Sequence, residues 1–278
     1  MRTVLHLSDL HFGRTRPDLL DPLVKLAADL APDLVVVSGD FTQRARRNQF
    51  VDAAKFLDRL RSPWLAVPGN HDVSLDNVMI RMLDPWGRYR SLIHHDLSPR
   101  HEDEEITVVG VNTVNRYAQQ AGRIGRSQLK VIASAFHENP QNTVVVVMHH
   151  PPEHPVGSSK RLMSHSGKGV EALRQAGADI VLSGHLHNAH VAPLSAAPGI
   201  LLVQAGTGLS TRLRDEANTL NFLTIEPGHV RVDRYAAFET PAFEVIETAW
   251  FGRDLSDPNA PWEALTGMAP VSVAAQST

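Results

Sequence analysis

The sequence predicts an α/β protein in which two β-sheets pack face to face and helices flank them. Strand-like runs alternate with helical patterns as far as about residue 183. Beyond that point strand-like runs follow one another, separated by Pro and Gly without intervening helices. At 278 residues, with 42% hydrophobic and 21% charged residues, the chain is long enough for one large domain with a substantial core.

The alternating part contains short apolar runs, several of them β-branched, of the kind that is buried on both faces of a sheet. The predicted strands lie at 5–7, 34–37, 64–67, 106–111, 143–148 and 179–182. Helical spacing of apolar residues predicts helices that begin at Asp21 as N-cap, cover 50–60, run from Ser127 to about Asn139, and cover 167–176. Residues 74–105 are less regular and predict a partly helical excursion.

The later strand-like runs, at 191–194, 200–204, 221–226 and 230–235, predict an antiparallel second sheet. We expect one domain over residues 1–237, followed by a loosely packed extension over 238–278 that is rich in Pro, Ala and Ser. Its aromatic residues Trp250, Phe251 and Trp262 are a candidate contact surface for a homo-oligomer.

Composition excludes some classes of function. A formal net charge of -3 disfavours a polyanion-coating surface, so we expect no stable nucleic-acid partner. Cys is absent, so any metal must be held by oxygen and nitrogen ligands. The apolar run at the N-terminus meets Ser8 and Asp9 too soon for a signal sequence or a membrane span, which favours a cytoplasmic protein.

Polar residues cluster directly after five of the predicted strands. In open α/β sheets, sites form in the crevice beyond the carboxyl ends of the strands, so these clusters are expected to meet. Together they supply two carboxylates, one amide and four or five imidazoles, which suits two metal ions better than one. The clusters are Asp9/His11, Asp40, Asn70/His71/Asp72, His149/His150 and His185/His187. His6, between Leu5 and Leu7, is instead expected to be an interior histidine.

Five motifs in this order resemble the signature of calcineurin-like metallophosphoesterases: Asp9-x-His11, Gly39-Asp40, Gly69-Asn70-His71-Asp72, His149 and Gly184-His185-x-His187. The resemblance spans roughly Leu5 to Tyr235 and implies the family's four-layer α/β/β/α fold, with residues 1–237 as the catalytic domain. It also implies that Asp9, His11 and His187 hold one metal ion, that Asn70, His149 and His185 hold the other, and that Asp40 bridges them. Such ligands accept Mn, Fe, Zn or Co, so the metal identity stays open.

The implied reaction is attack on phosphorus by a hydroxide that bridges two divalent or trivalent ions. By the resemblance, His71 faces the substrate and protonates the departing alkoxide. Asp72 either orients the His71 ring or only caps the following turn, and the sequence leaves both roles open.

The motifs Gly69-Asn70-His71-Asp72 and His149-His150-Pro151-Pro152 resemble the bacterial phosphodiesterase branch rather than the protein phosphatases. The expected substrate is a small phosphodiester, such as a cyclic nucleotide or a glycerophosphodiester. Three alternatives stay open: a nucleotide-sugar or lipid pyrophosphatase, a phosphomonoesterase, and a non-catalytic metal-bound interaction module. A nuclease acting on long polymers is disfavoured by the acidic balance.

Substrate contacts are expected from the residues beside the ligands. Arg44 is equally well interpreted as a solvated arginine at a helix start. Loops at 73–100 and 153–168, the latter with Lys160 and Arg161, are expected to cover the site. The full set of predicted substrate-binding residues is Asn70, His71, His150, Asn112 and Arg44.

Overall fold

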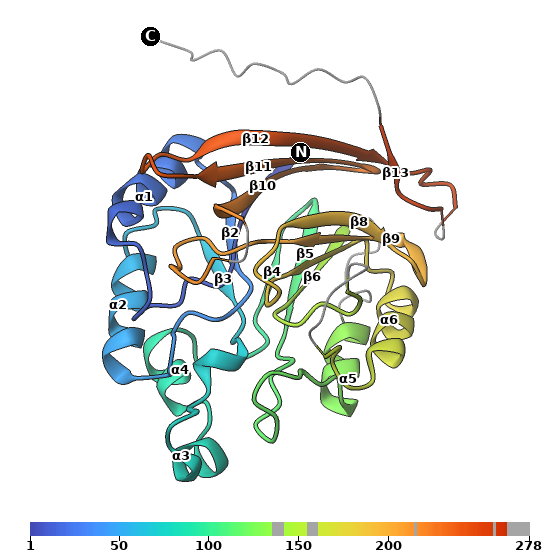
Figure 1. Ribbon diagram of the computed structural model, residues 1–278. Helices are drawn as coiled ribbons and strands as arrows, with labels where there is room; N and C mark the ends of the chain where they lie inside the picture. The colour runs from blue at the N-terminus through green and yellow to red at the C-terminus, as the bar shows by residue number, and fades with distance from the viewer. Residues whose placement is uncertain (135–141, 155–160, 214–215, 258–259, 266–278) are drawn as a thin grey trace.

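The computed structural model describes residues 1–134, 142–154, 161–213, 216–257 and 260–265, and contains two β-sheets stacked between two layers of helices (Figure 1). The first sheet has seven strands, in the order β13 (Glu263–Ala264), β12 (Glu244–Gly252), β11 (His229–Ala237), β10 (Asn218–Glu226), β1 (Arg2–Leu7), β2 (Leu34–Val37) and β3 (Trp64–Ala66). The second has six, in the order β4 (Arg100–Glu102), β5 (Ile106–Val111), β6 (Thr143–Met148), β7 (Ile180–Ser183), β9 (Ala197–Gln204) and β8 (His190–Leu194). The predicted α/β class with two sheets flanked by helices is confirmed.

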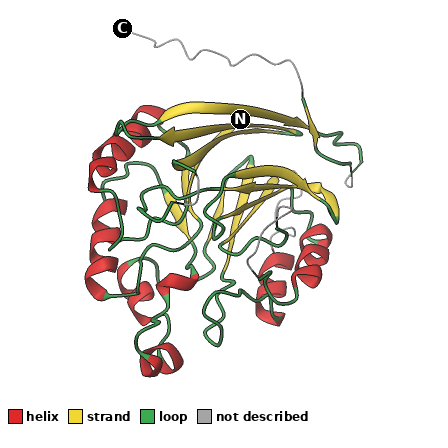
Figure 2. Cartoon of the chain, viewed as in Figure 1, coloured by secondary structure: helices red, strands yellow, loops and turns green. Residues whose placement is uncertain are grey.

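Helices cover the outer face of each sheet (Figure 2). The seven-stranded sheet packs against α1 (Leu20–Leu30), α2 (Arg47–Leu57) and α4 (Gly87–Leu92), and the six-stranded sheet against α5 (Arg126–Ser134) and α6 (Ser166–Gln175). The short helix α3 (Val78–Leu83) lies in the predicted excursion, away from both sheets. Among the residues that the structure describes, no helix combines the length and the apolar character needed to span a membrane.

Alternation along the strands explains why the apolar runs are continuous. In β2, Val35 and Val37 pack against the helices, whereas Leu34 and Val36 pack against the other sheet. Successive side chains of a strand point to opposite faces, so a strand with a covered sheet on both sides needs apolar residues at every position. Every second residue of each strand therefore belongs to the core between the two sheets.

The helix boundaries differ slightly from the predicted ones. A 3-10 turn, η1 (Pro17–Leu19), leads directly into α1, so Asp21 lies inside the first turn instead of capping it. An acidic residue in the first turn still favours the helix, because it faces the positive end of the helix dipole. The expected continuation of α5 to Asn139 falls on residues 135–141, which lie outside the described part of the chain.

The prediction of a separate antiparallel sheet from the later strands is wrong. Strand β9 pairs in parallel with β7, opposite Ile180 at Leu201, and β10 pairs antiparallel with β1, opposite Val4 at Leu223. Residues from β9 and β10 enter the same core between the sheets. Extending both existing sheets covers this shared core from both sides, which an isolated meander would not do.

The region after residue 237 is not uniformly loose, contrary to the prediction. Strand β12 pairs with β11 along its whole length and extends the seven-stranded sheet. Phe251 and Trp262 are 5% and 3% exposed, and the Trp262 indole N–H donates to the Asp179 carbonyl at 3.1 Å. These two aromatic residues are part of the core between the sheets, so they do not supply the predicted contact surface.

Candidate metal centre

Parallel pairing brings the five polar motifs to the same edge of the molecule. Strands β1, β2 and β3 are parallel neighbours, as are β5, β6 and β7, so their carboxyl ends lie together in each sheet. The two sheets are joined at this edge, because the His185 backbone N–H donates to Asp9 Oδ2 at 2.9 Å. One constellation can therefore draw ligands from both sheets.

Most of the predicted ligands have a left-handed backbone conformation, which is uncommon for residues other than Gly. Such strain persists where surrounding contacts over-determine it, and it is concentrated at functional sites. The residues with positive φ in this set are Asp9 (52°), His11 (50°), Asp40 (55°), His185 (72°) and His187 (66°).

Two glycines of the motifs are required by close packing. A Cβ at Gly69 would collide with the backbone nitrogen and the carboxylate of Asp40. A Cβ at Gly184 would collide with Ser8 Oγ and would lie 2.5 Å from Asp9 Oδ2. Both glycines thus allow a neighbouring strand end to place a carboxylate against the backbone.

The first half of the centre consists of Asp9, His11, Asp40 and His187, all buried. One potential ligand atom from each lies within 4.8 Å of the others. His187 Nε2 lies 3.2 Å from Asp9 Oδ1 and 3.3 Å from His11 Nε2. Asp9 Oδ1 is buried without a hydrogen bond of acceptable geometry among the described residues. Imidazole nitrogens that converge on an unsatisfied carboxylate oxygen fit a first-row cation.

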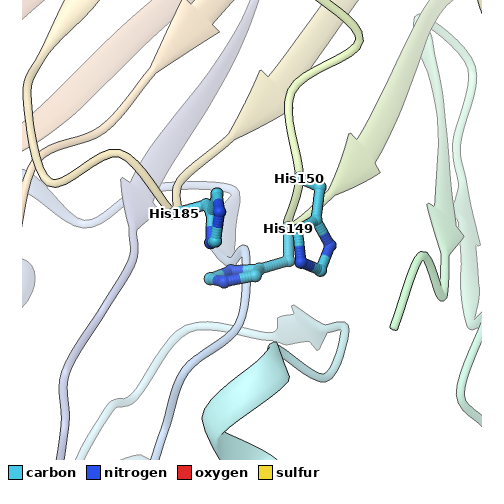
Figure 3. Close-up of side chains that lie close together, drawn as sticks. All are labelled: His149, His150 and His185. Carbon is cyan, nitrogen blue, oxygen red and sulfur yellow. The ribbon is translucent and has the colours of Figure 1, made fainter. Parts of the chain in front are cut away.

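The second half contains Asn70, His149 and His185. His149 Nε2 lies 3.2 Å from Asn70 Oδ1, and Figure 3 shows the His185 ring beside it. The two halves meet at Asp40, whose Oδ2 lies 3.4 Å from His149 Nε2 and 3.8 Å from His11 Nε2. This position between the two sets of imidazoles is the one a bridging carboxylate would need.

Outer hydrogen bonds orient two of the imidazoles. His149 Nδ1 donates to the Ser38 carbonyl at 2.8 Å, and His187 Nδ1 donates to the Arg212 carbonyl at 3.1 Å. In both rings Nε2 is left to face the centre. Metal-binding histidines are held in this way in proteins, because the outer bond fixes both the tautomer and the ring orientation.

The charges inside the centre shift one another's pKa values. Burial alone would raise the pKa of Asp40, but His149 and His71 outweigh burial and hold it well below its ordinary value. Burial is likewise outweighed at Asp9, where His187 and His11 lower the pKa. For His149, burial lowers the pKa but the facing Asp40 raises it to about 9. Both carboxylates are therefore anionic at neutral pH, as metal ligands must be.

His71 lies at the edge of the centre and is half-buried. Its ring is 4.9 Å from the His11 ring, and its Nδ1 donates to the Gln43 carbonyl at 2.9 Å. Its Nε2 accepts a hydrogen bond from Arg212 Nη1 at 3.1 Å. Burial lowers its pKa, although Asp40 opposes the shift. An imidazole beside the ligands but outside their set is suitably placed to act on a substrate.

Asp72 is buried behind His71. Its carboxylate accepts from the backbone N–H groups of Gly69 at 2.9 Å, Thr42 at 2.9 Å and Phe41 at 3.2 Å. Burial, together with Asp40, raises its pKa to about 7. These bonds tie the turn after β2 to η2 (Asn70–Asp72) instead of reaching the His71 ring. The bonds run to preceding backbone rather than to the His71 ring or the following turn, so both roles left open by the sequence stay predictions.

The other predicted substrate contacts are spread around the centre. His150 is buried, with Nδ1 2.8 Å from Thr113 Oγ1 and Nε2 3.1 Å from the Gln120 carbonyl. One of its ring nitrogens nevertheless lies within 4.8 Å of potential ligand atoms of His149 and His185, so the three imidazoles form a second group that could hold a metal ion. Asn112 uses its Oδ1 to accept from the Val114 backbone N–H at 3.0 Å.

The predicted contact Arg44 and the residues Lys160 and Arg161 of the expected covering loop remain. Arg44 and Arg161 have exposed side chains. Lys160 falls within residues 155–160, outside the described part of the chain.

Arg212 is a candidate functional residue that the sequence analysis missed. It lies between β9 and β10, in the segment Ser210-Thr211-Arg212-Leu213, which matches none of the five motifs. Its guanidinium contacts His71 and its carbonyl contacts His187. Only the spatial arrangement reveals it, because nothing in the local pattern distinguishes it from other loop arginines.

Comparison with curated proteins finds bacterial phosphodiesterases. A probable cyclic nucleotide phosphodiesterase of Rhodopseudomonas palustris is 25% identical over 201 residues, covering 65% of this chain and 70% of that protein. A probable glycerophosphodiester phosphodiesterase of Arcobacter nitrofigilis is 27% identical over 124 residues, covering 44% of this chain and 42% of that protein. The matched stretch is thus less than half of the Arcobacter protein's length.

Solved structures share the fold. A purple acid phosphatase from yellow lupin has a TM-score of 0.71 at 13% identity, over 92% of this chain and 55% of that one. A dimetal phosphatase from Danio rerio has a TM-score of 0.66 at 14% identity, over 90% of this chain and 98% of that one. Residues 2–189 match the family model described as calcineurin-like phosphoesterase. The chain therefore belongs to the calcineurin-like phosphoesterase family, as its motifs indicated.

Proposed function

We propose that this chain is a binuclear metal-dependent phosphodiesterase that hydrolyses a small phosphodiester, such as a cyclic nucleotide or a glycerophosphodiester. The observation that carries the proposal is the position of Asp40 Oδ2, between His11 and His149. A centre with two halves and one shared carboxylate suits two metal ions. The proposed ligands are Asp9, His11 and His187 for one ion, Asn70, His149 and His185 for the other, and Asp40 for both.

Two metal ions in such a site acidify a water molecule for attack on phosphorus and stabilise the charge that develops on the phosphoryl oxygens. Asn70 is neutral, so it binds without reducing the positive charge of the centre. His71 is anchored through Nδ1, so its Nε2 is the atom that we assign to protonation of the leaving oxygen. Asp72 holds the turns that carry Asp40 and His71.

The named relatives favour a diester substrate over the alternatives. Two of them are called phosphodiesterases, one for cyclic nucleotides and one for glycerophosphodiesters. A UDP-2,3-diacylglucosamine pyrophosphatase from Chlamydia muridarum is 35% identical, but over only 25% of this chain and 22% of that protein. This match keeps pyrophosphate hydrolysis as the second candidate.

The first experiment compares bis-p-nitrophenyl phosphate with p-nitrophenyl phosphate after the protein has been stripped of metal and reloaded with Mn. We expect metal-dependent cleavage that favours the diester. His71→Ala should retain both ions and lower kcat by about 10²- to 10⁴-fold, the usual contribution of a general acid. Asn70→Ala should lose both activity and one ion.

The other outcomes separate the alternatives. Preference for the monoester would replace the diester assignment with a phosphomonoesterase. With two ions bound, cleavage of a nucleotide-sugar pyrophosphate but of neither ester would favour the pyrophosphatase. Binding of two ions with no hydrolysis of any of these compounds would favour the interaction module. A cytoplasmic location, the lack of a nucleic-acid partner and the homo-oligomer stay predictions from the sequence.

A further inference from the structure

The segment that carries Arg212 is fixed against the first metal-binding turn. The Gly208 backbone N–H donates to the Ser8 carbonyl at 3.0 Å, and the Thr211 backbone N–H donates to the Arg14 carbonyl at 2.7 Å. Ser210 is fully buried, and its carbonyl accepts from Asn218 Nδ2 at 2.9 Å. The backbone of Arg212 is therefore held in place before any ligand arrives, which lowers the entropic cost of using its side chain.

Arg212 contacts the site in two chemically separate ways. Its carbonyl oxygen accepts from His187 Nδ1, a contact that any side chain at this position would preserve. Its guanidinium Nη1 donates to His71 Nε2, beside the ligand cluster. Because a guanidinium has donors but no acceptor, His71 Nε2 must offer its lone pair in this arrangement.

We infer that Arg212 is a substrate-positioning residue that binds a non-bridging phosphoryl oxygen of the substrate. This inference rests on the proposed function, since it assigns a role within the same site. The substrate class that it recognises is a phosphate ester carrying at least one negative charge.

The relative strength of the competing hydrogen bonds supports this assignment. A guanidinium bond to an oxyanion is charge-assisted at both ends and shorter than one to a neutral imidazole. A phosphate that enters beside His71 therefore displaces the imidazole as the partner of Nη1. The exchange frees the lone pair of His71 Nε2 to take up a proton from solvent, and the resulting Nε2–H is what it donates to the leaving-group oxygen. One arginine thus orders the free site and then orients the bound phosphate.

The geometry of the guanidinium group adds selectivity for phosphate. Arginine presents parallel N–H groups that match two oxygens of a phosphate, whereas lysine presents a point charge. Arg212→Lys is therefore the conservative variant, and Arg212→Met removes the charge while keeping an extended side chain. Neither change alters the carbonyl that holds His187.

The test is the binding of inorganic phosphate to the Mn-loaded protein, measured by titration calorimetry. Arg212→Met should raise the Kd of phosphate about tenfold to a hundredfold, the value of a hydrogen bond to a charged group, and Arg212→Lys should give an intermediate increase. Arg126→Met, at an exposed arginine that begins α5, is the matched control and should bind phosphate as the parent does. Mn content should equal the parent's in all three variants.

Hydrolysis then distinguishes this inference from the proposed function. If the parent cleaves the diester, Arg212→Met should raise KM for it by a similar factor. Unchanged phosphate affinity and KM in a folded, Mn-loaded Arg212→Met protein would overturn the role of Arg212 and leave the phosphodiesterase assignment standing. Weaker phosphate binding in a parent that cleaves no ester would support Arg212 while refuting that assignment.

Discussion

The metal centre and its rim are built differently, where the rim means the predicted substrate contacts Arg44 and Asn112 together with Arg161 of the loop expected to cover the site. All seven predicted ligands in the centre are buried, and five have left-handed backbone conformations. At the rim, Arg44 and Arg161 are exposed, and the side chain of Asn112 is bonded to the backbone of its own turn. The difference teaches that strand ends fix the proposed ligands in place, whereas loop packing sets the side chains of the rim.

The largest effect is expected from Asp40→Asn, which changes the metal centre itself. The amide keeps the volume and an oxygen for the His71 backbone N–H, which now donates to Asp40 Oδ1 at 2.7 Å, but it removes the charge shared by both halves. We expect the loss of one Mn per chain and a fall in kcat of about a thousandfold, comparable to removing one transition-state charge stabiliser. Metal analysis and diester hydrolysis measure both effects.

Asp29→Asn, at an exposed site on α1, is the matched control and should change neither quantity. Two bound ions and a kcat within tenfold of the parent in Asp40→Asn would show that Asp40 does not bridge.

Asp72→Asn tests whether the turns behind the centre support it. The amide NH₂ group cannot accept the backbone N–H bonds that the second carboxylate oxygen now accepts, so buried donors are left unpaired. We expect a loss of about 1–3 kcal/mol in the free energy of unfolding of the metal-free protein. Urea unfolding measures it, with the exposed Asp52→Asn on α2 as control. A loss of activity with unchanged stability would instead favour the role of orienting His71.

The meeting of the proposed ligands was predictable from the sequence, because the residue types and their positions just after strands are both local features. Asp9, Asp40 and His149 directly follow apolar runs, and parallel strands deliver their carboxyl ends to one edge. Arg212 was not predictable in this way. Its position depends on hydrogen bonds to residues nearly 200 positions earlier, such as the bond between Thr211 and Arg14.

The same distinction explains the errors in the fold. Strand identity follows from apolar runs, and the predicted strands are present with small shifts of their ends. Pairing partners are decided by the core that each strand completes, so β9 and β10 joined different sheets instead of forming their own. Trp262 was misplaced for the same reason: its Pro- and Ala-rich surroundings suggested a loose tail, while the core that its ring joins is made by distant strands.

His6 lies beneath the centre and provides a test by pH. Its ring is buried, its Nε2 lies 2.9 Å from Ser38 Oγ, and burial lowers its pKa from 6.5 to about 3. Below pH 6.5 the His6 imidazole therefore binds a proton in the unfolded chain but stays neutral in the native protein. Stability that is complete above pH 6.5 should fall towards pH 3, by at most about 1.4 kcal/mol per pH unit from this one group.

His6→Gln should make the loss of stability between pH 6.5 and 5.5 shallower in metal-free protein, as measured by urea unfolding. His229→Gln changes an exposed histidine on β11 and should leave the parent's slope intact. Identical slopes in His6→Gln and the parent would mean that His6 accepts its proton in the folded protein.

The smallest effect is expected at the rim, from Arg44→Ala. Arg44 is exposed, and the one hydrogen bond described for it joins its backbone N–H to Gln49 Oε1 at 2.9 Å, which Arg44→Ala preserves. We expect kcat/KM for the diester to change by less than about twofold, the usual range for a surface substitution. Arg212→Met provides the comparison within the same assay. A tenfold loss in Arg44→Ala would place a second arginine on the phosphate, and the free structure would then understate how far the rim closes over its substrate.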